Sequence, residues 1–97
     1  MSDDEKAFVM RNMIENLPIL RSKLNISQEQ LANLLGLTRQ SISTFENGQR
    51  KITWSVFLAM VLIFFRNEPT KHLLVVFDIY TPALNNYLNI SKNDRGY

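Results

Sequence analysis

The sequence predicts an all-α protein, a compact bundle of five to six short helices. Three observations predict this class. Apolar residues recur at helical spacing along most of the chain, residues that cap helix N-termini precede these segments, and no segment alternates apolar and polar residues as a strand does. The length, 97 residues, corresponds to one small core, so residues 1–97 are expected to form a single domain.

Two helices are expected before residue 25. The first spans about residues 3–12 or beyond, because Ser2 and Glu5 have the types and spacing of a capping box. The second spans about residues 17–24, with Asn16 as its N-cap. A proline lies in its first turn, where the missing N–H removes no helical hydrogen bond.

Residues 27–48 read SQEQLANLLGLTRQSISTFENG and predict two further short helices joined by a tight turn. Ser27 and Gln30 form a second capping box at the start of the first of these helices. Gly36 suits a turn that requires a positive φ. Thr38 is the expected N-cap of the second helix.

The C-terminal half predicts helices over about residues 54–66, 69–77 and 82–89. The first of these, WSVFLAMVLIFFR, is apolar at nearly every position and therefore cannot have one solvated face. Two explanations remain open: the following helices wrap around it, or part of it lies in a dimer interface. The helices of about residues 69–90 are accordingly assigned to packing or dimerisation.

The second helix of the 27–48 segment has the most informative surface. Ile42 and Phe45 are expected to point inward. The outer face then holds a guanidinium, an amide and two hydroxyls, from Arg39, Gln40, Ser43 and Thr44. These groups match the base edges in the major groove of DNA, which admits a helix. An ordinary corner between two helices with a polar outer face is the alternative interpretation.

The same segment resembles the helix-turn-helix of the Cro/C1 (lambda-repressor-like) family of transcriptional regulators. Ala32, Gly36 and Ile42 occupy the small, turn and core positions of that motif, and the strings TRQSI and FENG are similar to its recognition helix and exit loop. The resemblance covers about residues 15–65. It implies a bacterial or phage protein that binds double-stranded DNA in the major groove. It also implies a repressor that acts as a homodimer on an operator with two half-sites.

On this interpretation Arg39 and Gln40 contact bases, together with Thr44 and Ser43. Gln28 is expected to touch phosphate and to brace Arg39 or Gln40. Phosphate contacts are expected from a set of polar and basic residues that flank the base contacts: Gln28, Thr38, Ser41, Asn47, Gln49, Arg50 and Lys51.

Arg21 and Glu46 match two family positions that form a partly buried ion pair. In the family this pair joins the first helix of the domain, which precedes the helix-turn-helix, to the end of the recognition helix. From the residue types alone, Arg21 could equally contact phosphate and Glu46 could be a solvated acid. A glutamate at a helix C-terminus is unfavourable, and a nearby cation would compensate it.

The charge distribution agrees with a nucleic-acid partner. The net charge is +2 at pH 7. Residues 16–51, which include the motif, hold five basic and only two acidic side chains, as an electrostatic footprint for DNA requires.

Other classes of function lack a sequence signal. The chain has no cysteine and one histidine, His72, so neither a thiolate metal site nor a histidine cluster is expected. No serine has a base at a recognisable spacing, and no glycine-rich phosphate loop is present. The acidic N-terminus lacks the pattern of a signal peptide, and the apolar run of residues 56–65 is too short to span a bilayer. We therefore expect a cytoplasmic protein without enzymatic activity, metal, cofactor or membrane partner.

Two alternatives keep the motif but change the role. The protein could be the antitoxin of a toxin–antitoxin pair, with its apolar C-terminal half covering a second protein. It could also be a protein-interaction module whose helix-turn-helix no longer binds DNA. Loss of DNA binding usually shows as acids on the recognition helix, and residues 39–44 contain none.

Overall fold

The computed structural model describes residues 1–93 and confirms the all-α class. Within that range the chain forms seven helices and no strand. The helices are α1 (Asp3–Leu24), α2 (Gln28–Leu35), α3 (Arg39–Glu46), α4 (Trp54–Arg66), α5 (Glu68–Val76), α6 (Pro82–Leu88) and α7 (Ile90–Asn93). The sequence did not predict the short α7. No helix in this range is both long and apolar enough to cross a membrane.

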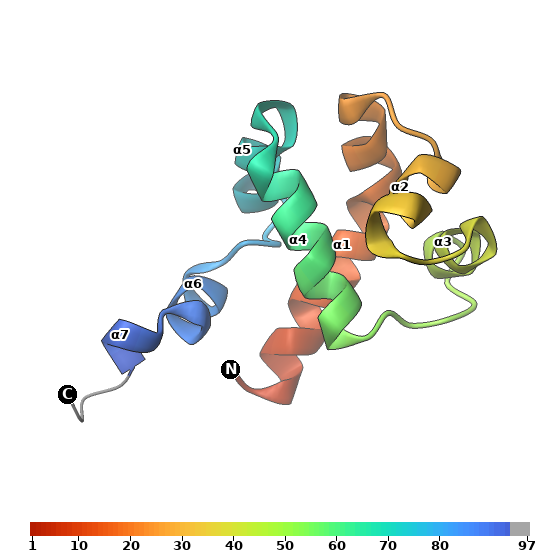
Figure 1. The fold of residues 1–97 in the computed structure, drawn as a ribbon. Coiled ribbons are helices and arrows are strands. Elements are labelled where there is room, and N and C mark those ends of the chain that lie inside the picture. Colours follow the sequence, from red (N-terminus) through yellow and green to blue (C-terminus); the bar gives the residue numbers. More distant parts are fainter. Residues whose placement is uncertain (94–97) are drawn as a thin grey trace.

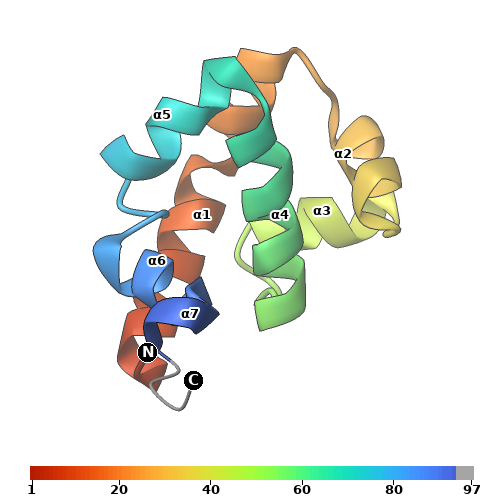
Figure 2. The same ribbon diagram turned by 60° about the vertical axis from the view of Figure 1, so that its left-hand side comes forward.

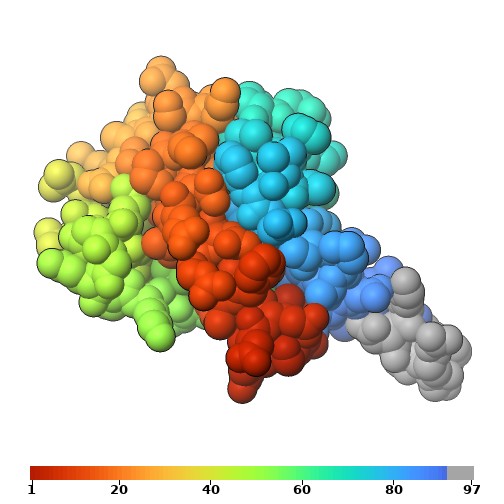
Figure 3. All heavy atoms as spheres, turned by 180° about the vertical axis from the view of Figure 1, so that it is seen from behind, coloured from red at the N-terminus to blue at the C-terminus, as the bar shows by residue number. Residues whose placement is uncertain are grey.

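Helices α1 and α4 pack against each other and form the centre of the bundle (Figure 1). Helices α2 and α3 lie on one side of this pair, and α5 packs on both α1 and α4. Figure 2 shows α6 beside the N-terminal part of α1. Seen from behind, α1 runs diagonally across the molecule between the motif helices and α5 (Figure 3). Helix α1 is therefore the support to which both halves attach.

Helix α1 is one continuous helix, so the prediction of two helices with a break at Asn16 is wrong. Asn16 lies inside the helix, where its side-chain amide donates to the carbonyl of Asn12 at 2.8 Å. Pro18 also lies inside the helix, at a cost of about 3 kcal/mol. Continuation of the helix keeps four buried side chains on one face, each worth about 1.5–3 kcal/mol: Val9, Met13, Leu17 and Leu20. Their burial outweighs the cost of the proline.

The apolar helix α4 is covered mainly by helices of the same chain. Its buried residues are Phe57, Met60, Val61 and Phe64, and α1 and α5 pack against it. Helix α6 contributes Tyr87, whose ring forms a T-shaped pair with Trp54 at a centroid distance of 6.1 Å. Coverage by other helices of the same chain thus explains most of the apolar sequence of α4. Leu62 remains 70% exposed and Phe65 is 38% exposed.

A buried hydrogen bond and a cation–π arrangement hold the C-terminal helices in place. The hydroxyl of the fully buried Thr70 donates to the carbonyl of Phe64 at 2.7 Å, which fixes the corner between α4 and α5. The ammonium of Lys6 lies 5.1 Å from the ring centroids of both Trp54 and Tyr87. This cation–π arrangement joins α1, α4 and α6.

Candidate nucleic-acid interface

Local hydrogen bonds shape the segment from Ser27 to α3 as the sequence predicts. The Ser27 hydroxyl accepts from the backbone N–H of Gln30, and the Gln30 side chain accepts from the backbone N–H of Ser27 at 2.8 Å. Gly36 ends α2 with a φ of 71°, and a side chain there would be strained. Thr38 caps α3 by accepting from the backbone N–H of Ser41. The turn and the start of α3 are therefore defined by short-range contacts.

Helix α3 packs by its inner face and lies at the edge of the molecule, away from α6 and α7 (Figure 1). Ile42 and Phe45 are buried in the common core with residues of α1, α2 and α4. Arg39 and Gln40 are exposed on the first turn of α3. Within residues 1–93 neither side chain forms a hydrogen bond or ion pair. Both polar groups are thus available to a ligand.

The other two predicted base contacts, Ser43 and Thr44, are only partly exposed. The Thr44 hydroxyl donates to the carbonyl of Ser41 at 2.8 Å. Its proton is therefore engaged, and its oxygen and methyl group are what it can offer to a base. Arg39 and Gln40 therefore offer free polar groups, whereas the hydroxyls of Ser43 and Thr44 lie closer to the surface of the helix.

The predicted phosphate contacts flank α3 at both ends. At its start, the hydroxyls of the N-cap Thr38 and of Ser41 in the first turn are hydrogen-bonded to each other at 3.1 Å. After it, the Asn47 side chain accepts from the backbone N–H of Gln49 at 3.0 Å and shapes the exit loop. The loop then continues with two exposed cations, Arg50 and Lys51. The guanidinium of Arg50 lies 4.6 Å from the centroid of the Phe45 ring, a contact that the sequence does not predict.

Arg21 and Glu46 form a two-point ion pair that joins α1 to the end of α3. Arg21 Nε lies 2.7 Å from Glu46 Oε2, and Nη2 lies 3.0 Å from Oε1. Only 17% of the Arg21 side chain and 9% of the Glu46 side chain are exposed. The Gln28 amide also donates to Glu46 Oε1, at 2.9 Å. In the free protein Gln28 is therefore bonded to Glu46, and no hydrogen bond joins it to Arg39 or Gln40 within residues 1–93.

A metal centre has no support in the part of the chain that the structure describes, since no group of three His, Cys, Asp or Glu side chains is placed to hold an ion there. The available chemistry at α3 consists of hydrogen-bond donors, acceptors and positive charge on a helix that protrudes from its support. These properties suit recognition of a polyanion with exposed base edges.

Comparison with known proteins agrees with this geometry. A helix-turn-helix family model matches residues 19–64, which extend from the C-terminal part of α1 through α4. No curated protein and no solved structure matches the chain. The match includes the two capped helices, the Gly36 turn and the Arg21–Glu46 pair. Residues 19–64 therefore form a helix-turn-helix domain of the Cro/C1 type, the domain of DNA-binding regulators.

Proposed function

We propose that this protein is a sequence-specific transcriptional repressor of the bacterial or phage cytoplasm that binds an operator with two half-sites. The observation that supports this most strongly is the first turn of α3. Arg39 and Gln40 are exposed there and make no hydrogen bond or ion pair within residues 1–93. Helix α3 itself is held in place by its buried side chains and by the Arg21–Glu46 pair. A recognition element needs this combination of free contact groups and a rigid support.

The proposed contacts divide by type. Arg39 and Gln40 bind base edges in the major groove, and Ser43 and Thr44 line the same helix face closer to its surface. Phosphate is contacted by Thr38 and Ser41 at the start of the helix and by Asn47, Gln49, Arg50 and Lys51 after it. Gln28 joins this set through its second amide proton while it remains bonded to Glu46.

Selection of bound duplexes from a random DNA pool tests binding, sequence and half-site spacing together. On the selected site, Arg39→Ala or Gln40→Ala should cost about 1–3 kcal/mol and relax the preference at one base pair per half-site. Arg66→Ala is the matched control, because Arg66 is an exposed arginine at the far end of α4. Equal losses on selected and random DNA would contradict the assignment of Arg39 and Gln40 to base contacts.

We also propose that the protein acts as a homodimer through its C-terminal half. Four large apolar side chains of α4 and α5 remain at the surface: Leu62, Phe65, Val75 and Val76. Two copies related by a two-fold axis could bury these residues and place two α3 helices about 34 Å apart, one DNA turn. Leu74, Ile79 and Leu84 are fully buried within one chain and do not contribute.

Sedimentation equilibrium at micromolar concentration tests the dimer, followed by DNA binding to a series of half-site spacings. We expect a dimer for the wild type and a monomer for Leu62→Glu. A wild-type monomer that binds a single half-site with one-to-one stoichiometry would overturn the proposal. A second small protein that co-purifies through these residues would instead point to an antitoxin.

A further inference from the structure

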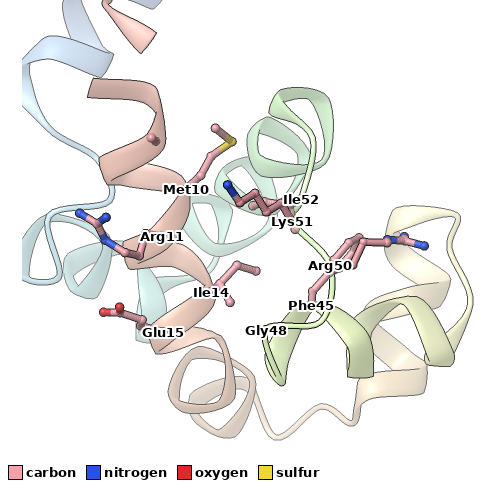
Figure 4. A pocket seen from close by; sticks show the side chains of 10 residues that line it. Met10, Arg11, Ile14, Glu15, Phe45, Gly48, Arg50, Lys51 and Ile52 are labelled. Atoms are coloured by element: carbon pink, nitrogen blue, oxygen red, sulfur yellow. The ribbon is translucent and has the colours of Figure 1, made fainter. Parts of the chain in front are cut away.

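A pocket lies between α1 and the chain that leaves α3 (Figure 4). Its volume is about 400 Å³, which is within the range of small-molecule sites, about 300–1,000 Å³. Phe45 and Ile52 form one wall and are almost fully buried. Met10 and Ile14 of α1 form the opposite wall and are partly exposed. The interior is therefore apolar, as the binding of a hydrocarbon group requires.

The charged residues around this pocket favour an anion. Three cationic residues and one acidic residue are among those that line it: Arg11, Arg50, Lys51 and Glu15. In Figure 4 the amine of Lys51 extends back toward Met10 of the opposite wall, whereas Arg50 points away from α1. The polar ends of Arg11 and Glu15 lie on the other side of α1 from the pocket interior. Lys51 is thus the charge that a ligand in the pocket would meet.

We propose that this pocket binds a free single-chain carboxylate, a molecule with a hydrocarbon tail and one anionic end. The tail lies between Met10, Ile14, Phe45 and Ile52, and the carboxylate pairs with Lys51 Nζ. The apolar walls alone would accept any hydrocarbon of suitable size, so Lys51 determines the preference for an anion. A charge-assisted hydrogen bond to the ammonium is the interaction that supplies it.

Such a ligand regulates DNA binding, an inference that rests on the proposed function. One wall of the pocket includes Phe45 on the inner face of α3, and Lys51 is a proposed phosphate ligand. One ammonium cannot fully neutralise a bound carboxylate and a DNA phosphate together. Each neutralised phosphate contributes about 0.9 to the log–log salt slope, so release of one phosphate at 0.1 M salt lowers DNA affinity about eightfold.

Binding is tested without DNA, by NMR of the full-length protein with ¹³C-labelled methionine methyl groups. The chain has four methionines. Met10 lines the pocket, whereas Met13 and Met60 are buried in the core, and Met10→Leu assigns the informative signal. Three probes of equal chain length are titrated below their micelle concentrations: decanoate, decanol and decylamine. We expect a saturable shift of the Met10 methyl with decanoate, weaker binding of decanol, and the weakest binding of decylamine.

Two lysine variants test the charge. Lys51→Gln should reduce decanoate affinity to that of decanol and leave decanol binding unchanged. Lys23→Gln removes the same charge from an exposed residue outside the pocket and should leave both affinities unchanged. Absence of a saturable Met10 shift with all three probes would overturn the site. Decylamine binding as tight as decanoate binding would overturn the assignment of Lys51.

The regulatory step is then tested on the selected operator. Saturating decanoate should lower wild-type affinity about eightfold at 0.1 M salt and reduce the salt slope by about 0.9. In Lys51→Gln, which has no ammonium to bind that phosphate, decanoate should have no further effect on the slope. Unchanged DNA affinity with decanoate bound would refute the regulation and leave the site intact. A protein that binds decanoate but never DNA would refute the proposed function and not the pocket.

Discussion

Replacement of Glu46 by alanine tests whether the ion pair between α1 and α3 stabilises the fold. Glu46 accepts three hydrogen bonds, two from Arg21 and one from Gln28. In Glu46→Ala the Arg21 guanidinium keeps only its bond to the Ile26 carbonyl, at 3.3 Å. The substitution therefore leaves a mostly buried cation without its counter-charge.

The expected loss of stability follows from this burial. Removal of one partner from a buried pair costs about 3–5 kcal/mol, whereas exposed pairs contribute about 0–1 kcal/mol. Because 17% of the Arg21 side chain is exposed, water can replace part of the missing interaction. We therefore expect the lower end of the buried range, about 3 kcal/mol.

Urea unfolding at pH 7, followed by circular dichroism and by the fluorescence of Trp54, measures this change. The dependence on urea concentration should keep its slope, because the surface exposed on unfolding is the same. Glu15→Ala is the matched control and should change the unfolding free energy by less than about 0.5 kcal/mol, since Glu15 is exposed and makes no ion pair within residues 1–93. Arg21→Met with Glu46→Met should be less harmful than Glu46→Ala, since no charge stays unpaired. A destabilisation below about 1 kcal/mol for Glu46→Ala would refute the reasoning.

Two further predictions concern charge. Replacement of Arg50 and Lys51 by alanine should weaken binding to all DNA sequences alike and lower the log–log salt slope by about 0.9 for each phosphate that is no longer bound. The same change at Lys23 and Arg66 should leave the slope unaltered, and an unaltered slope in both double variants would show that the loop does not contact phosphate. The pKa of the Glu5 carboxyl lies below its ordinary value of 4.5. The main cause is the hydrogen bond from the backbone N–H of Ser2, the N-cap residue, and the second is a hydrogen bond with the Ser2 side chain. The contribution of Glu5 to stability is therefore present above pH 4.5 and declines as the pH falls through the lowered folded-state pKa. An NMR titration in which Glu5 has the same pKa in folded and urea-unfolded protein would contradict this.

The sequence alone predicted the features that depend on short-range contacts. Ser27, Gln30 and Thr38 cap their helices as expected, and Gly36 adopts its positive φ, because each involves hydrogen bonds or sterics within a few residues. Helical spacing likewise placed Ile42 and Phe45 on the inner face of α3. The exposed position of Arg39 and Gln40 follows from that spacing. The Cro/C1 resemblance depends on these same local positions.

Only the tertiary structure decided the features that depend on distant parts of the chain. Pro18 and Asn16 favour a helix break locally, yet α1 continues because α4 and α5 bury its apolar face. Gln28 bonds to Glu46, and the sequence could not predict this partner 18 positions away. The pocket has walls from α1 and from the chain after α3, so neither segment alone contains it. The physical reason is that burial and long-range hydrogen bonds are properties of packed neighbours, whereas caps and turns are properties of consecutive residues.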